Sequence, residues 1–182
     1  MATKKSAKAS KRPAQKSARK SASRKSTPRT PPNEAIAQLT ADHARVKKMF
    51  KQYEKLAKAE ADDSERQELA AMICQELTAH ATAEEEIFYP AARESIGEAD
   101  LVDEAEVEHA SAKDLIAQIE SSSPSDEQYD AKVKVLGEYV NHHVEEEEGE
   151  MFPKVRRAKL DTVALGEQIA ARKAEIMQGN VK

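Results

Sequence analysis

The stretch His80-Ala-Thr-Ala-Glu84-Glu-Glu-Ile-Phe-Tyr-Pro90 has a counterpart in His143-Val-Glu-Glu-Glu147-Glu-Gly-Glu-Met-Phe-Pro153. In both stretches a glutamate follows the histidine by four residues, and a proline follows it by ten. Side chains four residues apart lie on one face of an α-helix, so each stretch predicts an imidazole and a carboxylate that point the same way. Because proline disfavours further helix, each helix is expected to end at its proline.

A further histidine precedes each stretch, His43 by 37 residues and His109 by 34 residues. The order His, His-x3-Glu therefore occurs twice, which indicates an internal duplication of a pair of helices. In such a bundle, histidines from four helices and glutamates from two of them would meet in the interior.

Apolar residues recur at helical spacing in four long segments, 34–59, 65–89, 99–120 and 126–151, and in a shorter one at 160–178. Asn33 and the pairs Ser64–Gln67 and Ser125–Gln128 are expected to cap the first, second and fourth helices. The sequence predicts an all-α protein, an up-down-up-down four-helix bundle over residues 33–180. An additional C-terminal helix is expected to pack outside the bundle and cover one end.

Residues 1–32 have a different composition from the rest of the chain. They hold 11 of the 29 Lys and Arg residues, no acid, and no Leu, Ile, Val or aromatic residue. Such a segment buries too little apolar surface to offset the entropy of ordering, so it is predicted to be a disordered basic tail. Its charge favours contact with DNA or RNA phosphates, while a solubilising tail and a transit peptide are the alternatives.

The composition excludes several classes of protein. A chain of 182 residues with 4% aromatic and 34% charged residues suits one helical domain plus a tail. The single cysteine, Cys74, excludes an internal disulfide, and no apolar run is long enough to span a membrane. We therefore expect a cytoplasmic protein, a monomer or weak dimer, with nucleoid association through the tail.

A metal site would explain why two glutamates lie on the core side of their helices. Burial of an unpaired carboxylate is costly, and a metal cation supplies the missing charge. Imidazole and carboxylate without thiolate suit iron, manganese or zinc, and six ligands are too many for one tetrahedral zinc, which favours two metals that share the glutamates. The predicted metal ligands are His43, His80, Glu84, His109, His143 and Glu147.

Two alternatives concern these histidines. His142 competes with His143 and would pair with Glu146, but it lies about 100° off the core line of its helix. In the other alternative the histidines are ordinary core residues, and the chain is a DNA-associated structural protein with a metal-free bundle.

The combined motifs resemble the haemerythrin-like, or HHE cation-binding, family over residues 36–153. The resemblance implies two non-haem iron ions, bridged by carboxylates and by an oxo group, with dioxygen, nitric oxide or peroxide as the small ligand. It implies terminal ligands at the four histidines and bridges at Glu84 and Glu147. The motifs that carry it are Leu39-Thr-Ala-Asp42-His43, His80-x3-Glu84 with Glu85 and Phe88-Tyr89-Pro90, Glu108-His109, and His143-x3-Glu147 with Phe152-Pro153.

The chain departs from the oxygen carriers of that family at two positions. Lys113 stands where the carriers have a fifth histidine, and the carriers bridge with the residue that corresponds to Glu148 rather than to Glu147. The chain thus resembles the symmetrical His/His-x3-Glu subtype, which favours sensing, peroxide or nitric oxide chemistry, or iron handling over oxygen carriage.

The main alternative function is that of a di-iron enzyme, which would decompose hydrogen peroxide in the manner of a catalase or reduce nitric oxide. A ferritin-like site is disfavoured, because that site needs Glu-x-x-His on two helices and only Glu106-x-x-His109 fits.

Overall fold

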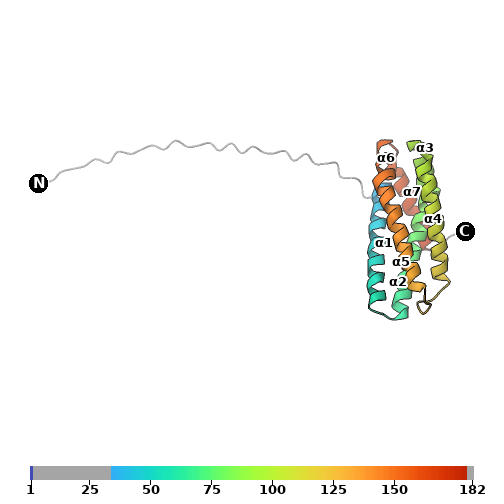
Figure 1. Ribbon diagram of the computed structural model, residues 1–182. Helices are drawn as coiled ribbons and strands as arrows, with labels where there is room; N and C mark the ends of the chain where they lie inside the picture. Colours follow the sequence, from blue (N-terminus) through green and yellow to red (C-terminus); the bar gives the residue numbers. More distant parts are fainter. Residues whose placement is uncertain (2–33, 180–182) are drawn as a thin grey trace.

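The computed structural model describes Met1 and residues 34–179, and over that range the chain is helical and has no strand (Figure 1). The predicted basic tail therefore falls outside the described residues, apart from Met1, and so does the predicted cap Asn33. Within the described residues we find no helix with the length and hydropathy to traverse a lipid bilayer.

Four antiparallel rods of helix form the bundle (Figure 1). The first rod is α1 (Ala35–Lys58), and the third is α4 (Ala99–Glu120). The second and fourth rods each consist of three consecutive segments. These are α2 (Asp63–Ala83), η1 (Glu84–Phe88) and α3 (Tyr89–Ile96), and then α5 (Tyr129–Glu146), η2 (Glu147–Met151) and α6 (Phe152–Arg157). The predicted all-α, up-down-up-down bundle is confirmed for the described part of the chain.

The second and fourth rods continue past Pro90 and Pro153, so the prediction that they end at these prolines is wrong. Each proline lies in the first turn of a new α-helical segment, where a missing N–H costs little. A π-helical turn precedes each of these segments, and its hydrogen bonds join residues five apart rather than four. This shift in hydrogen-bond register lets the helical rod continue past the proline. The π-helical turn begins at Glu84 in η1 and at Glu147 in η2.

The predicted caps are also wrong where the structure describes them. Glu34 caps α1 through its own carboxylate, which accepts the backbone N–H three residues on. Ser64 lies inside α2, which begins at Asp63 without a side-chain cap. α5 begins at Tyr129, later than predicted, because Asp126 takes part in a preceding turn. The apolar periodicity therefore predicted the helices, and the start of α4 at Ala99 as well, whereas the proposed capping residues were wrong.

Two apolar cores fill the bundle, one on either side of a polar layer. The lower core, near the α1–α2 turn in Figure 1, includes Tyr53, Ile73 and Leu136. The upper core includes Ile36 and Phe88. Between them lie seven buried polar side chains: Asp42, His43, His80, Glu84, His109, His143 and Glu147. A layer of this kind is stable only when its members partner one another or a ligand.

The fifth helix, α7 (Thr162–Met177), packs along the sides of α1 and α2 rather than over an end of the bundle, which corrects its predicted position. Ile169 is fully buried in the upper core. Arg172 forms an ion pair with Glu86 in η1, and Lys173 forms one with Asp42 in α1. α7 is therefore fastened to the first pair of helices at the level of the polar layer.

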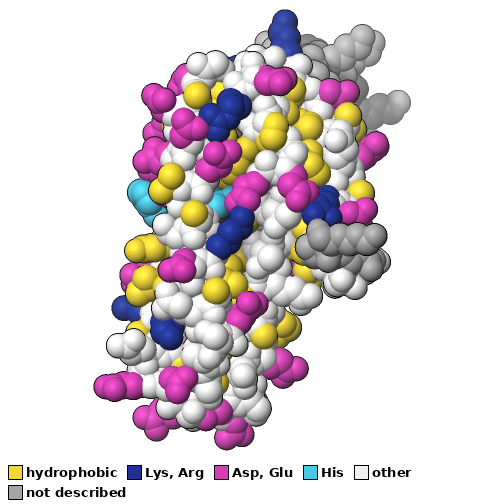
Figure 2. All heavy atoms as spheres, turned by 90° about the vertical axis from the view of Figure 1, so that its right-hand side faces the viewer, with side chains coloured by type: hydrophobic (Ala, Val, Ile, Leu, Met, Phe, Trp, Pro, Cys, Tyr) yellow, Lys and Arg dark blue, Asp and Glu magenta, His cyan; other side chains and the backbone are white. Residues whose placement is uncertain are grey.

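Among residues 34–179, no further helix packs on the outer side of the second pair of helices as α7 does on the first. Val107 in α4 and Tyr139 in α5 remain largely exposed. Acidic side chains are spread over the face of the molecule seen in Figure 2, and histidine atoms reach the surface there among them.

Leu136→Ala should lower the free energy of unfolding by about 2–5 kcal/mol, because it opens a cavity in the lower core without touching the polar layer. Urea denaturation followed by circular dichroism measures the change. Val107→Ala, at an exposed site in α4, is the control and should stay within about 0.5 kcal/mol of the parent. Equal effects of the two substitutions would contradict the assignment of the lower core.

Candidate metal centre

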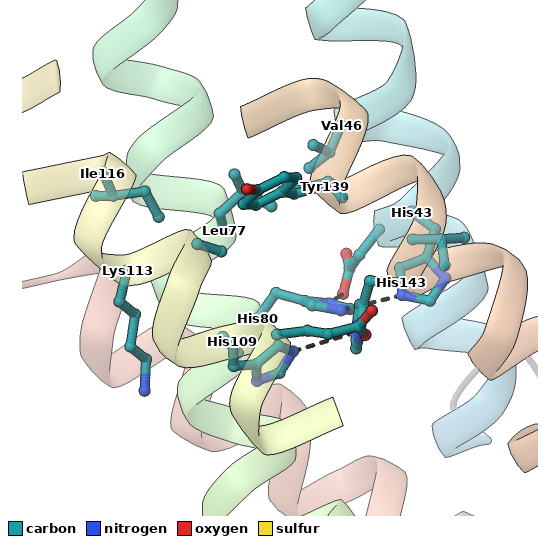
Figure 3. Close-up of a pocket in the computed structure, with 15 residues that line it drawn as sticks. His43, Val46, Leu77, His80, His109, Lys113, Ile116, Tyr139 and His143 are labelled. Carbon is teal, nitrogen blue, oxygen red and sulfur yellow. Dashed lines mark hydrogen bonds and ion pairs between the residues drawn. The ribbon is translucent and has the colours of Figure 1, made fainter. Parts of the chain in front are cut away.

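Four imidazoles from four helical rods meet in the polar layer, and their Nε2 atoms point toward one another (Figure 3). The Nε2 atoms of His43 and His80 lie 3.1 Å apart, and those of His109 and His143 are also 3.1 Å apart. All four side chains are at most 7% exposed. The duplicated helix pairs therefore each contribute one close pair of imidazoles.

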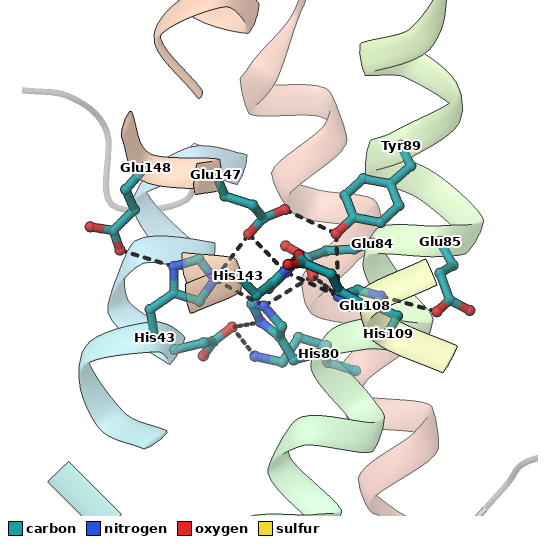
Figure 4. Close-up of polar contacts among 12 residues, drawn as sticks. His43, His80, Glu84, Glu85, Tyr89, Glu108, His109, His143, Glu147 and Glu148 are labelled. Atoms are coloured by element: carbon teal, nitrogen blue, oxygen red, sulfur yellow. Dashed lines mark hydrogen bonds and ion pairs between the residues drawn. The ribbon is translucent and has the colours of Figure 1, made fainter. Parts of the chain in front are cut away.

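Each buried glutamate lies between imidazoles of the two helix pairs (Figure 4). Glu84 Oε2 is 3.0 Å from Nε2 of His80 and 3.5 Å from Nε2 of His109. Glu147 occupies the corresponding position between the other two imidazoles, at 3.3 and 3.5 Å. The ligand atoms form two groups, and Glu84 belongs to both. One group consists of His43, His80, Glu84 and Glu147, and the other of Glu84, His109 and His143.

An outer carboxylate holds the second ring nitrogen, Nδ1, of each imidazole (Figure 4). A carboxylate accepts a hydrogen bond from Nδ1–H, so this contact fixes the tautomer and leaves the lone pair of Nε2 directed inward. This is the arrangement that metal-binding histidines adopt. The four pairs are His43–Glu148 at 2.9 Å, His80–Asp42 at 3.5 Å, His109–Glu85 at 3.0 Å and His143–Glu108 at 2.8 Å.

Each π turn places two consecutive glutamates on the two nitrogens of one imidazole ring. Glu84 faces Nε2 of His109 while Glu85 accepts from Nδ1 of the same imidazole. η2 repeats this arrangement around His43. Each helix pair thus orients a histidine of the other pair, and the two halves of the bundle are joined at the site.

The unpaired oxygens in the layer fit a metal cation. Both carboxylate oxygens of Glu84 and Oε2 of Glu147 are buried and accept no hydrogen bond. Such orphaned acceptors are rare and costly. Ligand atoms about 2.1 Å from a shared metal lie roughly 3.0–3.4 Å from one another, and the contacts among the imidazole and carboxylate atoms fall at or close to that spacing. The donor set therefore suits cations bound between the four Nε2 atoms and the two glutamates.

Two of the four imidazoles, those of His80 and His143, show the same demand for positive charge in their ionisation. Burial by itself lowers the pKa of His80, but the charge of Glu84 and the bond to Asp42 raise it to about 10. Burial likewise opposes protonation of His143, yet the bond to Glu108 and the adjacent charge of Glu147 raise its pKa to about 10. A metal cation would take over this role of the protons and release them on binding.

One side of the centre carries a hydroxyl that the other side lacks. Tyr89, fully buried, donates a hydrogen bond to Glu147 Oε1 at 3.0 Å and lies 3.2 Å from Nε2 of His109. Phe152 holds the equivalent place in the duplicated half and stacks on His43. Burial, and then the charges of the two glutamates, raise the pKa of Tyr89 well above its usual value, so it remains a proton donor.

A small apolar cavity of about 40 Å³ reaches the imidazoles from the side of the lower core (Figure 3). Leu77, Ile116 and Val140 line its wall, and the half-exposed Tyr139 lies near its outer part. Its lining is almost free of polar surface apart from the histidine end. A small uncharged molecule fits this route better than an ion does.

The structure brings together all six side chains that the sequence singled out: His43, His80, Glu84, His109, His143 and Glu147. His142, the competitor of His143, is on the surface and is 64% exposed. The roles of the outer carboxylates and of Tyr89 were not predicted. The signal was present, because each outer carboxylate directly precedes a histidine or directly follows a core glutamate.

Comparisons with known proteins point to one family of cation-binding domains. The family profile of the hemerythrin HHE cation binding domain matches residues 34–155. A protein named DNA nickase, from Nostoc sp. (strain PCC 7120), is 33% identical over 139 residues, which are 75% of this chain and 38% of that protein. The chain thus spans well under half of that relative's length.

Among solved structures, a hemerythrin HHE cation binding domain-containing protein from Mycobacterium kansasii superposes with a TM-score of 0.66. The two chains are 24% identical, and the match covers 80% of this chain and 88% of that one. At this identity the likeness establishes the fold alone.

Glu148→Gln should weaken binding of a divalent cation by about 10–100-fold, because it removes the charged partner that orients His43. Competition against a chromogenic chelator measures the affinity. Glu145→Gln is the matched control, since Glu145 is an exposed neighbour on the same rod and the charge change is identical. Equal affinities of the two variants would contradict the role assigned to the outer carboxylates.

Proposed function

This chain belongs to the hemerythrin HHE cation-binding domain family, and we propose that it holds two non-haem iron ions and uses them to bind or sense dioxygen or nitric oxide. The terminal ligands are His43, His80, His109 and His143, and the bridging ligands are Glu84 and Glu147. The observation that carries this proposal is the set of four inward Nε2 atoms around carboxylate oxygens that accept no hydrogen bond.

The donor set is compatible with iron, and the family resemblance makes iron the metal that we propose. Imidazole and carboxylate ligands without thiolate suit iron, and six ligands leave each of two metals short of six-coordination. Bound iron supplies reversible redox chemistry and open positions for a small ligand. The residues of the chain contribute the orientation of the imidazoles, through the four outer carboxylates, and the exclusion of bulk water.

The cavity supports a diatomic gas as the ligand. Its wall exposes almost no polar surface, which suits dioxygen and nitric oxide better than peroxide, because peroxide needs hydrogen-bond partners. α4 supplies a single histidine, because position 113 holds a lysine where the oxygen carriers have a histidine. The ammonium of Lys113 forms an ion pair with Glu85. This departure from the oxygen carriers supports sensing, or iron handling, over oxygen transport.

A peroxide-decomposing or nitric oxide-reducing enzyme is the second candidate, and Tyr89 is the observation in its favour. Its buried hydroxyl donates to Glu147 and adjoins His109, which places a transferable proton beside the proposed centre. Chemistry that cleaves an O–O or N–O bond consumes protons, whereas reversible gas binding does not need them.

We further propose that residues 1–32 tether the protein to nucleic acid. Their 11 basic residues and lack of acids suit contact with phosphates. The relative named DNA nickase adds support for a nucleic-acid setting, although its activity is stated only for that much longer protein. The tail and the folded region, residues 33–180, would then be separate functional units.

Protein purified in air should contain about two irons per chain and show a visible charge-transfer absorption. Both should be lost in Glu84→Ala/Glu147→Ala, because the bridging carboxylates are removed. Metal analysis and absorption spectroscopy provide the measurement. Glu84→Gln/Glu147→Gln, which preserves side-chain shape, should lose iron as well and guards against simple misfolding. Unchanged iron content in both variants would refute the centre.

The same preparation separates binding from catalysis. A binding protein gives a spectral change that saturates at a stoichiometric amount of dioxygen or nitric oxide, with no continued consumption. Sustained release of dioxygen from peroxide, or sustained loss of nitric oxide with a reductant, would favour the enzyme instead.

DNA should be retarded in gel electrophoresis by the full chain at low salt, and its affinity should fall steeply as salt rises, because each phosphate contact releases counterions. A variant with the 11 Lys and Arg of residues 1–32 replaced by Gln is the matched control and should leave DNA unshifted. Unchanged DNA mobility at low salt, even with excess full-length protein, would contradict the tether.

A further inference from the structure

A second group of metal-ligating side chains lies on the outer face of α4 and α5. His142 Nε2 is 3.4 Å from Glu146 Oε1 and 3.6 Å from Glu108 Oε1. Atoms bound to one tetrahedral cation about 2.1 Å away would lie about 3.4 Å apart, so these three side chains already stand near ligand spacing. His142 and Glu146 are 64% and 38% exposed, which makes the group accessible from solvent.

Glu108 connects this surface group to the buried centre. Its Oε1 faces His142, while its Oε2 accepts from Nδ1 of His143 at 2.8 Å. One carboxylate therefore takes part in both sites.

A small cavity joins the same two places. Its lining includes Glu108 and Glu146 of the surface group and His143 and Glu147 of the buried centre. Its volume of about 10 Å³ is close to that of one water-sized sphere. Glu147, 1% exposed, borders this cavity, and its Oε2 accepts no hydrogen bond. The buried carboxylate of Glu147 thus borders a cavity that two members of the surface group also line.

The first helix pair shows how the carboxylate that corresponds to Glu108 is neutralised. Asp42 corresponds to Glu108, and there the ammonium of Lys173 from α7 forms an ion pair with it. Burial by itself raises the pKa of Asp42, but the bonds to His80 and Lys173 lower it to about 2, so it stays ionised.

The second half has no equivalent lysine. Within the described residues no Lys or Arg forms an ion pair with Glu108. His142 and Glu146 correspond to Ala79 and Ala83, which are fully buried beneath the cover of the first half. Where one half has a protein cation, the other half has solvent access and two additional metal ligands.

We propose that His142, Glu146 and Glu108 form an entry site for a divalent cation, which receives Fe²⁺ from solvent and passes it to the buried centre. The transfer is a ligand exchange in which Glu147 and His143 replace Glu146 and His142, with no change in the charge of the metal. This inference rests on the proposed di-iron function, since it describes how that centre is loaded.

The first test asks whether the surface site exists. Iron-loaded protein titrated with Co²⁺ by calorimetry should bind one further equivalent. His142→Ala and Glu146→Gln should each weaken this step at least about tenfold, and Glu138→Gln, an exposed acid on the same helix, should not. The absence of a further equivalent, or equal weakening by Glu138→Gln, overturns the proposal and leaves His142 and Glu146 as an ordinary surface ion pair.

The second test asks whether the site delivers metal. Metal-free protein mixed with Fe²⁺ without oxygen should load severalfold more slowly in His142→Ala, while the final iron content remains that of the parent. Equal loading rates overturn the entry role. Failure of the di-iron function gives a different result, because then the parent itself does not accumulate iron in its buried centre.

Discussion

The burial of two carboxylates in the middle of a helical bundle is the constraint on which this structure depends. Glu84 and Glu147 are at most 1% exposed, and most of their oxygens accept no hydrogen bond. Ionised groups in such a place require positive charge close by. Four imidazoles surround them, and each imidazole is fixed by a further carboxylate at its other nitrogen. The polar layer is therefore organised from the glutamates outward, and two separate apolar cores supply the stability that the layer does not.

The π turns are the backbone feature that makes this layer possible. Each begins at a core glutamate and directs the following glutamate to the far nitrogen of a histidine in the other helix pair. A regular α-helical register would meet the prolines at positions where a backbone donor is required. The same local deviation thus serves two purposes, since it carries the rod past a proline and holds an imidazole from both sides. π turns concentrate at functional sites for reasons of this kind.

Much of this arrangement could be predicted from the sequence, and the limits have physical causes. The helical period of apolar residues and the repeated His-x3-Glu spacing placed the rods, the core lines and all six central side chains. The start of α5 was missed because a turn built on Asp126 precedes it, and the cap of α1 was missed because Glu34 caps the helix in place of Asn33. The outer carboxylates were missed because an acidic residue beside a histidine is usually solvated, and only the three-dimensional crossing of the rods turns it inward. The π register was missed because proline alone is read as a stop.

The ligand set repeats almost symmetrically, but its surroundings do not, and the difference bears on what the centre can do. On one side Tyr89 donates a hydrogen bond to Glu147, and on the other Phe152 stacks on His43 and has no donor to offer. α7 seals the first helix pair and neutralises Asp42 with Lys173, whereas the corresponding Glu108 remains near solvent. Two metals held by equivalent ligands would therefore experience different hydrogen bonding, charge and access. Because imidazole and carboxylate ligation is shared by proteins of many functions, it is this unequal environment that selects the chemistry.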